Sequence, residues 1–188
     1  MNIKSCRHKD LCEVKKTYYK IILLIFLVYI FLFPSTLLAW TGKVVSVTDG
    51  DTAKIIRLDT GRQIKVRFAG IDSPEKEMAY GQAAKKFVGK LIGGKIVEVQ
   101  HVTFDRYGRT VGYIRLDGRE INFEIVEAGY TWVNRKYMPK PKKRADRYMR
   151  AEALARKSRI GLWQDPNPIP PWEWRKAQRL KRKKNKKR

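Results

Sequence analysis

Between residues 42 and 116 the chain alternates short apolar runs with turn signals, and this alternation restricts the fold more than any other feature of the sequence. Five runs have the length and patterning of half-buried β-strands. They cover residues 44–47, 53–56, 63–71, 96–102 and 110–116. Turns that contain glycine separate them, as at Asp49-Gly50 and Tyr107-Gly108. The first three runs therefore predict a β-meander.

A helical pattern stands between the third and the fourth run. Residues 80–92 place alanines and larger apolar side chains on one stripe, and Gly93-Gly94 ends the pattern. Two more helices are predicted over residues 121–128 and 142–159. Five strands with a helix after the third is the order of an OB-fold barrel. We therefore predict an α+β fold, mainly β: a five-stranded OB-fold barrel with about three helices.

The N-terminal 39 residues have the layout of an export leader. Six basic residues precede the apolar run 21–33, and the small residue Ala39 follows. We predict a signal peptide over residues 1–39 that is cleaved after Ala39. An uncleaved anchor is the alternative, because residues 21–40 are numerous enough to span a bilayer. In both cases the rest of the chain is expected to be exported. A cleaved chain would be periplasmic or secreted, and an uncleaved chain would stay attached to the membrane by residues 21–40.

Composition divides the exported part in two. The predicted domain covers residues 40–164, and residues 165–188 form a Pro-rich spacer with a basic tail. The tail has ten basic residues and one acid after position 171. We expect it to be disordered or only transiently helical, and to act as an electrostatic anchor on nucleic acid or on an anionic envelope surface.

Charge and residue usage narrow the class of function. The chain carries a formal charge of +24, and without the leader, which has six basic and two acidic residues, it keeps +20. So large an excess of one sign indicates a polyanionic partner. Both cysteines, Cys6 and Cys12, lie in the leader, which excludes thiol chemistry from the exported part. The two histidines, His8 and His101, exclude a histidine-rich zinc site.

Three charged clusters lie at turns beside apolar strands. Charges placed there are costly unless something pairs with them, which indicates a site. The clusters are Asp49-Gly50-Asp51-Thr52, the segment from Arg67 to Glu75 with Asp72 inside it, and Asp105-Arg106-Tyr107-Gly108-Arg109. Several carboxylates together with two arginines suit a hard cation and an anionic phosphate.

With these motifs the chain resembles the staphylococcal (micrococcal) nuclease or thermonuclease family over residues 42–163. The family signature has an Asp-Gly-Asp-Thr turn, an Arg-x-x-x-x-Asp-(Ser/Thr)-Pro-Glu segment and an Asp-x-Tyr-Gly-Arg turn, and all three occur here in that order. The resemblance implies an exported, calcium-dependent endonuclease that hydrolyses DNA and RNA and leaves 3′-phosphate ends. Such an enzyme is expected to be a monomer without a protein partner.

The resemblance also implies roles for particular residues. Arg67, Glu75 and Arg109 would be catalytic, the arginines binding phosphate and Glu75 acting as general base or water orienter. Asp51, Asp72 and the main-chain carbonyl of Ser73 would hold Ca²⁺, and Arg106, Tyr107 and Tyr137 would contact substrate. Arg135 replaces a second tyrosine of the family's base pocket. Two alternatives are a non-catalytic nucleic-acid-binding OB-fold module and a membrane-tethered envelope protein.

Overall fold

The computed structural model describes residues 18–24, 39–138 and 142–186. The chain divides into two compact units, Met1–Leu37 and Leu38–Arg188. In the first unit, residues 18–24 are helical and exposed. Most of the predicted leader lies outside the described residues, so its cleavage and its use as an anchor stay predictions. Among the described residues, no helix combines the length and the apolar character that crossing a bilayer requires.

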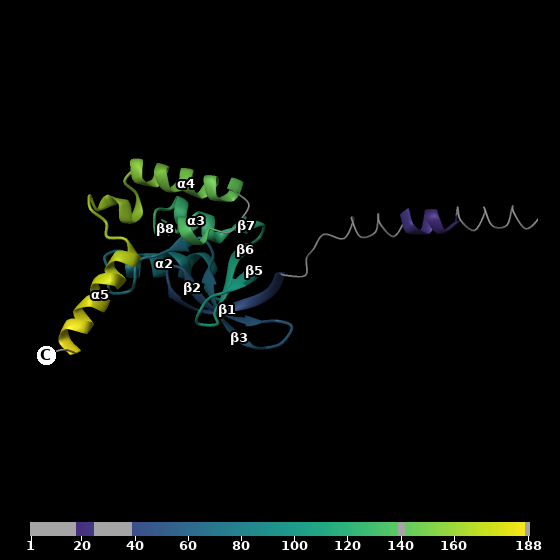
Figure 1. Cartoon of the computed structure of the whole chain (residues 1–188), viewed down its shortest axis with the longest axis horizontal. Helices are drawn as coiled ribbons and strands as arrows, with labels where there is room; N and C mark the ends of the chain where they lie inside the picture. Colours follow the sequence, from purple (N-terminus) through teal and green to yellow (C-terminus); the bar gives the residue numbers. More distant parts are fainter. Residues whose placement is uncertain (1–17, 25–38, 139–141, 187–188) are drawn as a thin grey trace, which may run out of the picture. The chain divides into compact units, whose positions relative to one another are not determined.

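The second unit is built around a closed β-barrel (Figure 1). Its long strands are hydrogen-bonded in the order β3-β2-β1-β5-β6, and a parallel pairing of β3 with β6 closes the sheet. These strands are β1 (Ala39–Asp49), β2 (Thr52–Arg57), β3 (Gln63–Phe68), β5 (Ile96–Phe104) and β6 (Thr110–Leu116). The predicted five-stranded, mainly β OB-fold barrel is confirmed.

Three short strands complete the sheets. β7 (Arg119–Glu120) pairs with β6 at the edge of the barrel sheet. β4 (Ile71–Asp72) pairs with β8 (Trp132–Val133) in a separate two-stranded sheet, in which Asp72 is the partner of Trp132. This small sheet matters for the site, because it fixes one acidic residue beside a tryptophan.

Alternation along β3 places a charge on the outside of the barrel. Val66 and Phe68 are buried in the core, and Arg67 between them is only partly covered. Successive side chains of a strand point to opposite faces, so the two apolar neighbours fix Arg67 on the outer face. The buried side chains of Val66 and Phe68 therefore position Arg67, which lies outside the core.

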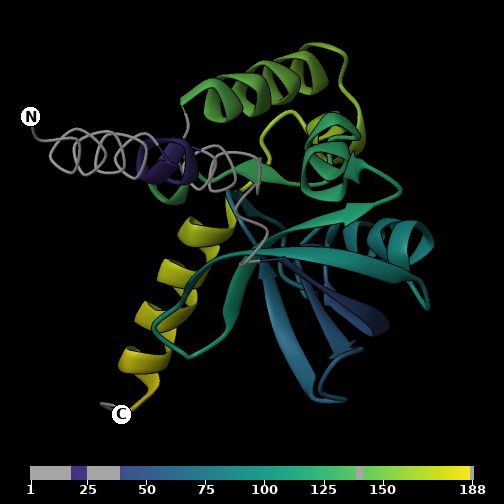
Figure 2. The same cartoon turned by 90° about the vertical axis from the view of Figure 1, so that its right-hand side faces the viewer.

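Helices cover the barrel on more than one side. Helix α2 (Gly81–Ile92) follows β4 and buries Ala84 and Val88, as the stripe in its sequence predicts. Helices α3 (Ile121–Glu127) and α4 (Lys142–Lys157) pack against each other, and Figures 1 and 2 show α4 lying over α3. The ring of Tyr148 in α4 meets that of Phe123 edge-on at 5.5 Å.

A further helix, α5 (Pro171–Lys186), stands where the sequence predicts a disordered or transiently helical tail. Pro171 begins the helix, a position at which the fixed φ of proline is favourable. The segment is tied down by contacts that the composition does not reveal: Pro171 is buried, and Trp172 meets Trp132 edge-on at 6.5 Å. The helix count of the described residues therefore exceeds the predicted three.

One buried amide joins three segments of the barrel. Asn122, in α3, accepts a hydrogen bond from the N–H of Ile114 at 3.0 Å. Its side-chain N–H₂ donates to the carbonyls of Ala69 at 3.1 Å and Gly112 at 3.3 Å. This side chain is fully buried, so it ties β6 and the end of β3 to α3 without help from water.

We expect Asn122→Ala to lower the free energy of unfolding by about 3 kcal/mol, because it leaves a buried N–H unsatisfied and opens a small cavity. Urea denaturation followed by tryptophan fluorescence measures the change. Asn167→Ala, at an exposed position after α4, is the control and should change stability by less than about 0.5 kcal/mol. Equal stabilities of the two variants would contradict the assigned role of Asn122.

Candidate active site

The turn between β1 and β2 brings two acids against the segment that follows β4. Asp49 ends β1, and Asp51 directly precedes β2. Gly50 between them approaches its neighbours so closely that a Cβ there would lie 2.7 Å from the Cβ atoms of Ala84 and Ser73. Only glycine allows this approach, so the Asp-Gly-Asp sequence brings Asp51 within reach of Ser73.

Asp51 is buried and surrounded by donors. Its Oδ2 accepts the backbone N–H of Ser73 at 2.5 Å, and its Oδ1 accepts the hydroxyl of Thr52 at 3.0 Å. The backbone N–H of Asp51 itself donates to Asp49 Oδ1 at 3.1 Å. Burial raises the pKa of Asp51 to about 8, against the opposing effect of the Arg67 charge. A positive charge near this carboxylate is therefore favourable.

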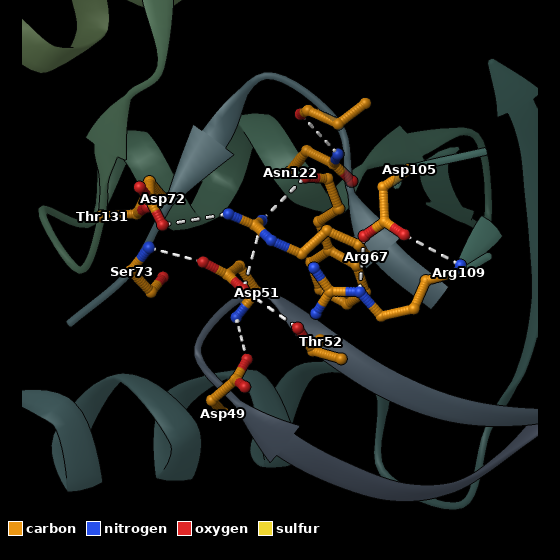
Figure 3. A network of polar contacts seen from close by, with 12 residues as sticks. Asp49, Asp51, Thr52, Arg67, Asp72, Ser73, Asp105, Arg109, Asn122 and Thr131 are labelled. Atoms are coloured by element: carbon orange, nitrogen blue, oxygen red, sulfur yellow. Dashed lines mark hydrogen bonds and ion pairs between the residues drawn. The ribbon is translucent and has the colours of Figure 1, made fainter. Parts of the chain in front are cut away.

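Arg67 supplies such a charge and joins two acids (Figure 3). Its Nη1 lies 3.2 Å from Asp51 Oδ1 and donates to the carbonyl of Phe68 at 3.0 Å. Its Nη2 donates to Asp72 Oδ1 at 3.0 Å. Asp72 is almost completely buried, whereas Arg67 keeps some exposure to solvent. The guanidinium therefore links the β1–β2 turn to β4, and the Arg67 side chain keeps 16% of its surface exposed.

The second predicted arginine, Arg109, lies on the same face of the barrel. Parallel pairing sets Arg67 opposite Val111, so Arg109, two residues earlier, projects to the same side as Arg67. Figure 3 shows Arg109 extending toward Arg67. Asp105 orients it by accepting Arg109 Nε at 2.6 Å.

The turn before Arg109 is organised by the same carboxylate. Asp105 Oδ1 accepts the backbone N–H groups of Tyr107 and Arg109 at 2.8 and 2.9 Å. Partial burial by itself raises the pKa of Asp105, but the hydrogen bonds from Arg109 and Tyr107 outweigh it and lower the pKa below its usual value. Asp105 therefore stays ionised and holds the arginine in place at neutral pH.

The three predicted substrate-contacting residues are all exposed. Tyr107 lies under both Arg106 and Arg109, whose guanidinium carbons are 4.8 and 5.5 Å from its ring centroid. Arg106 also donates to the Tyr107 hydroxyl at 2.7 Å. Tyr137 ends a short 3₁₀ helix (Arg135–Tyr137), and among the described residues no hydrogen bond or ion pair joins it to the carboxylates. The structure thus groups Arg106 and Tyr107 with Arg109; within the described residues, no hydrogen bond or cation–π contact joins Tyr137 to them.

Glu75 meets the rest of the site through an arginine of α5. Arg175 Nη1 donates to Glu75 Oε1 at 2.7 Å and to Asp72 Oδ1 at 3.2 Å, and its Nη2 donates to Asp72 Oδ2 at 2.6 Å. Burial by itself lowers the pKa of the Arg175 guanidinium, but the hydrogen bonds to Asp72 and Glu75 raise it above the ordinary value. Arg175 therefore binds both acids as a permanent cation.

Comparison with known proteins shows to which family these acids and arginines belong. Residues 65–165 match the family model described as staphylococcal nuclease homologue, which covers more than half of the chain. The chain belongs to the staphylococcal nuclease family. It is an endonuclease, an enzyme that hydrolyses phosphodiester bonds within nucleic acids.

Individual members of the family are similar to this chain over about two thirds or more of its length. An uncharacterized endonuclease of Escherichia coli is 36% identical over 148 residues, which is 78% of this chain and 92% of that protein. A micrococcal nuclease of Shigella flexneri is 38% identical over 153 residues, 74% of this chain and 84% of that one. A staphylococcal-like nuclease of Arabidopsis thaliana is 40% identical over 118 residues, 63% of this chain and 35% of its own.

The acids of this staphylococcal nuclease homologue offer carboxylate oxygens, which are the ligands that a hard cation prefers. Among the described residues, no cluster of three or more His, Cys, Asp or Glu side chains has the arrangement of a metal site. The predicted ligand set needs only two such side chains, Asp51 and Asp72, because its third ligand is the main-chain carbonyl of Ser73. Both carboxylates are buried and turned toward one guanidinium, and the buried hydroxyl of Ser73 has no hydrogen-bond partner. Oxygen donors that already attract a cation suit calcium better than zinc.

Sequence reasoning missed one residue of this nuclease site, Arg175, and one buried residue that holds the barrel behind it, Asn122. Asn122 lies in an ordinary helical pattern, so nothing in the sequence distinguishes it from a solvated helix residue. Arg175 is one of ten basic residues of the tail. Only its spacing from Trp172 distinguishes it from the others: the two residues are three positions apart and share one face of a helix. An apolar anchor next to a proline is the only signal that could have singled out this part of the tail.

Proposed function

We propose that the chain is an exported, calcium-dependent endonuclease that cleaves DNA and RNA and leaves 3′-phosphate ends. The observation that carries this proposal is the convergence of Asp51, from the β1–β2 turn, and Asp72, from β4, on the single guanidinium of Arg67. Two buried acids and a partly open arginine make a site that can accept both a cation and a phosphate.

The side chains divide the work of hydrolysis between them. Arg67 and Arg109, on one face of the barrel, bind the non-bridging oxygens of the scissile phosphate, where negative charge grows in the transition state. Glu75, about one third exposed, orients the attacking water and accepts its proton. Asp51, Asp72 and the Ser73 carbonyl would hold calcium, which supplies Lewis-acid stabilisation of the same charge.

Substrate is held by groups that read the backbone rather than the sequence of bases. Arg106 and Tyr107 form an exposed pair next to Arg109 and bind a neighbouring phosphate. Tyr137 offers an exposed ring for base stacking, and Arg135 at the start of the same 3₁₀ helix adds charge. Because DNA and RNA both present phosphates and unpaired bases, this arrangement favours cleavage of either.

We expect chelation to abolish cleavage of plasmid DNA by residues 40–188, and added calcium, but not zinc, to restore it. The reason is the ligand set, which consists of carboxylate and carbonyl oxygens. Asp72→Ala should lose the calcium response without unfolding, as judged by circular dichroism. Asp59→Ala, an exposed acid paired with Arg57, is the control and should respond like the parent. Full cleavage in excess chelator would contradict the calcium proposal.

The export part of the proposal rests on the leader alone. The basic residues, the apolar run and Ala39 follow the order of a signal peptide, and an anchor formed by residues 21–40 remains the alternative. Edman sequencing of the protein recovered from the culture medium, the periplasm and the membrane fraction tests it. A mature end at Trp40 supports cleavage, and a membrane-bound chain with an intact leader supports the anchor.

A further inference from the structure

Arg175 occupies the acids that the proposed reaction needs. Its guanidinium uses both oxygens of Asp72, at 3.2 and 2.6 Å, and one oxygen of Glu75, at 2.7 Å. The same Asp72 Oδ1 also accepts Arg67. Nearly every lone pair that Asp72 turns toward the site is therefore engaged by an arginine. Arg175 lies about a hundred residues beyond Asp72, so this contact is tertiary and not a property of the local sequence.

The fold shows what brings α5 to this place. Asp72 pairs with Trp132 in the β4–β8 sheet, and Trp172 packs edge-on against the same Trp132. Trp163 also packs edge-on against Trp132, at 5.2 Å. One helical turn after Trp172, Arg175 lies on the same face of α5 and reaches Asp72. The contact between Trp172 and Trp132 thus holds α5 where Arg175 reaches Asp72 and Glu75.

A guanidinium and a divalent cation cannot use these oxygens together. Calcium requires carboxylate oxygens at about 2.3–2.6 Å, and it needs lone pairs that the Arg175 N–H groups occupy. Two positive charges a few ångströms apart also repel each other. Arg175 also competes with the water that Glu75 would deprotonate, because its Nη1 donates a hydrogen bond to Glu75 Oε1.

We propose that α5 is an autoinhibitory latch, in which Arg175 competes with the divalent cation for Asp72 and keeps Glu75 from its water. The proposal rests on the cation site put forward as the proposed function. Cation binding then requires α5 to leave, so the apparent affinity for calcium is reduced by the fraction of molecules in which the latch is closed. The enzyme responds only to calcium concentrations high enough to displace its own helix.

The latch is built to open. The Arg175 side chain is 38% exposed and that of Glu75 32%, so water and salt screen their ion pair. Beyond Arg175 the helix is exposed except at Gln178, which is half-buried. A contact of this size favours the closed form by about tenfold rather than by many orders of magnitude, and tenfold corresponds to about 1.4 kcal/mol.

Isothermal titration calorimetry of the full chain with calcium chloride tests the latch without relying on activity. We expect Arg175→Ala to bind calcium about tenfold more tightly than the parent. Trp172→Ala, which keeps Arg175 but removes the contact with Trp132, should shift affinity in the same direction. Arg179→Ala is the matched control: it removes the same charge from the same helix, at an exposed position for which no ion pair is recorded in the described part of the chain, and it should stay within about twofold of the parent.

The outcomes separate the latch from the proposed function. Equal calcium affinity in the parent, Arg175→Ala and Trp172→Ala overturns the latch and leaves calcium dependence in place. An increase as large in Arg179→Ala as in Arg175→Ala also overturns it, because general charge would then explain the effect. Absence of calcium binding in every variant overturns the latch and the calcium site together. If Arg175→Ala fails to fold by circular dichroism, the comparison of Trp172→Ala with Arg179→Ala decides.

Discussion

Replacing Arg67 by lysine is expected to lower kcat by about 10²-fold or more, while affinity for DNA falls much less. Lysine keeps the positive charge but loses the planar fork. In the structure that fork spans two acids, with Nη1 near Asp51 and Nη2 on Asp72, and the side chain keeps partial exposure to solvent. A single ammonium group cannot hold both acids and also bind two phosphate oxygens.

Steady-state kinetics on a short single-stranded oligonucleotide measure kcat, and fluorescence anisotropy in chelator measures binding. Arg62→Lys, at an exposed position in the β2–β3 turn, is the matched control and should leave both unchanged. If Arg67→Lys retains kcat within a few-fold of the parent, Arg67 is only a structural tie between the two acids. Comparison with Arg109→Lys then shows whether the second arginine carries the chemistry alone.

Asp51→Asn is expected to lower kcat by on the order of 10² while raising the melting temperature at neutral pH. The loss follows from removing a charged oxygen from the proposed cation site. The rise in melting temperature follows from burial, which raises the pKa of the Asp51 carboxyl from 3.8 to about 8. An amide avoids the penalty of ionising a buried carboxyl and can still accept the N–H of Ser73 through its oxygen.

The sign of the pH dependence follows from linkage. A carboxyl whose pKa is raised on folding binds more protons in the folded state than in the unfolded chain, so its contribution to stability is lost as pH rises from about 4 to about 8. The stability advantage of Asp51→Asn should therefore be small at pH 4.5 and larger at pH 8, measured by scanning calorimetry. Asp59→Asn, at a fully exposed carboxyl, is the control. An advantage that shrinks with rising pH would contradict the burial argument.

The barrel could be predicted from the sequence because its signals are local. Strands of five to ten residues that alternate apolar and polar side chains, with glycine turns between them, leave few arrangements with a helix after the third strand. The parallel closure of β3 on β6 joins Val66 to Thr110, and no local pattern encodes that pairing. The order of the elements predicts an OB-fold barrel but does not name the strands that close it.

The acids and arginines of the site were named from motifs, and the structure places five of them together. Asp51, Arg67, Asp72, Ser73 and Glu75 are linked by direct contacts or through Arg175. The Lys- and Arg-rich composition of the tail argues against a packed helix, and Trp172 beside Pro171 is the only contrary signal in the sequence. The order of α5 depends on two long-range contacts, Trp172 with Trp132 and Arg175 with Asp72, which only the folded barrel offers.

The parallel closure of the barrel has a consequence for when activity can arise during synthesis. Arg67 obtains its position from β2 and from β6, and the Asn122 amide that fastens the end of β3 is made later still. Loop-closure entropy makes contacts between such distant segments slow to form compared with local ones. A nascent chain that ends before residue 110 contains every acid and arginine of the signature but lacks both β6 and Asn122, which hold β3 in place. Synthesis through β6 and α3 is therefore a precondition for fixing Arg67 in the centre.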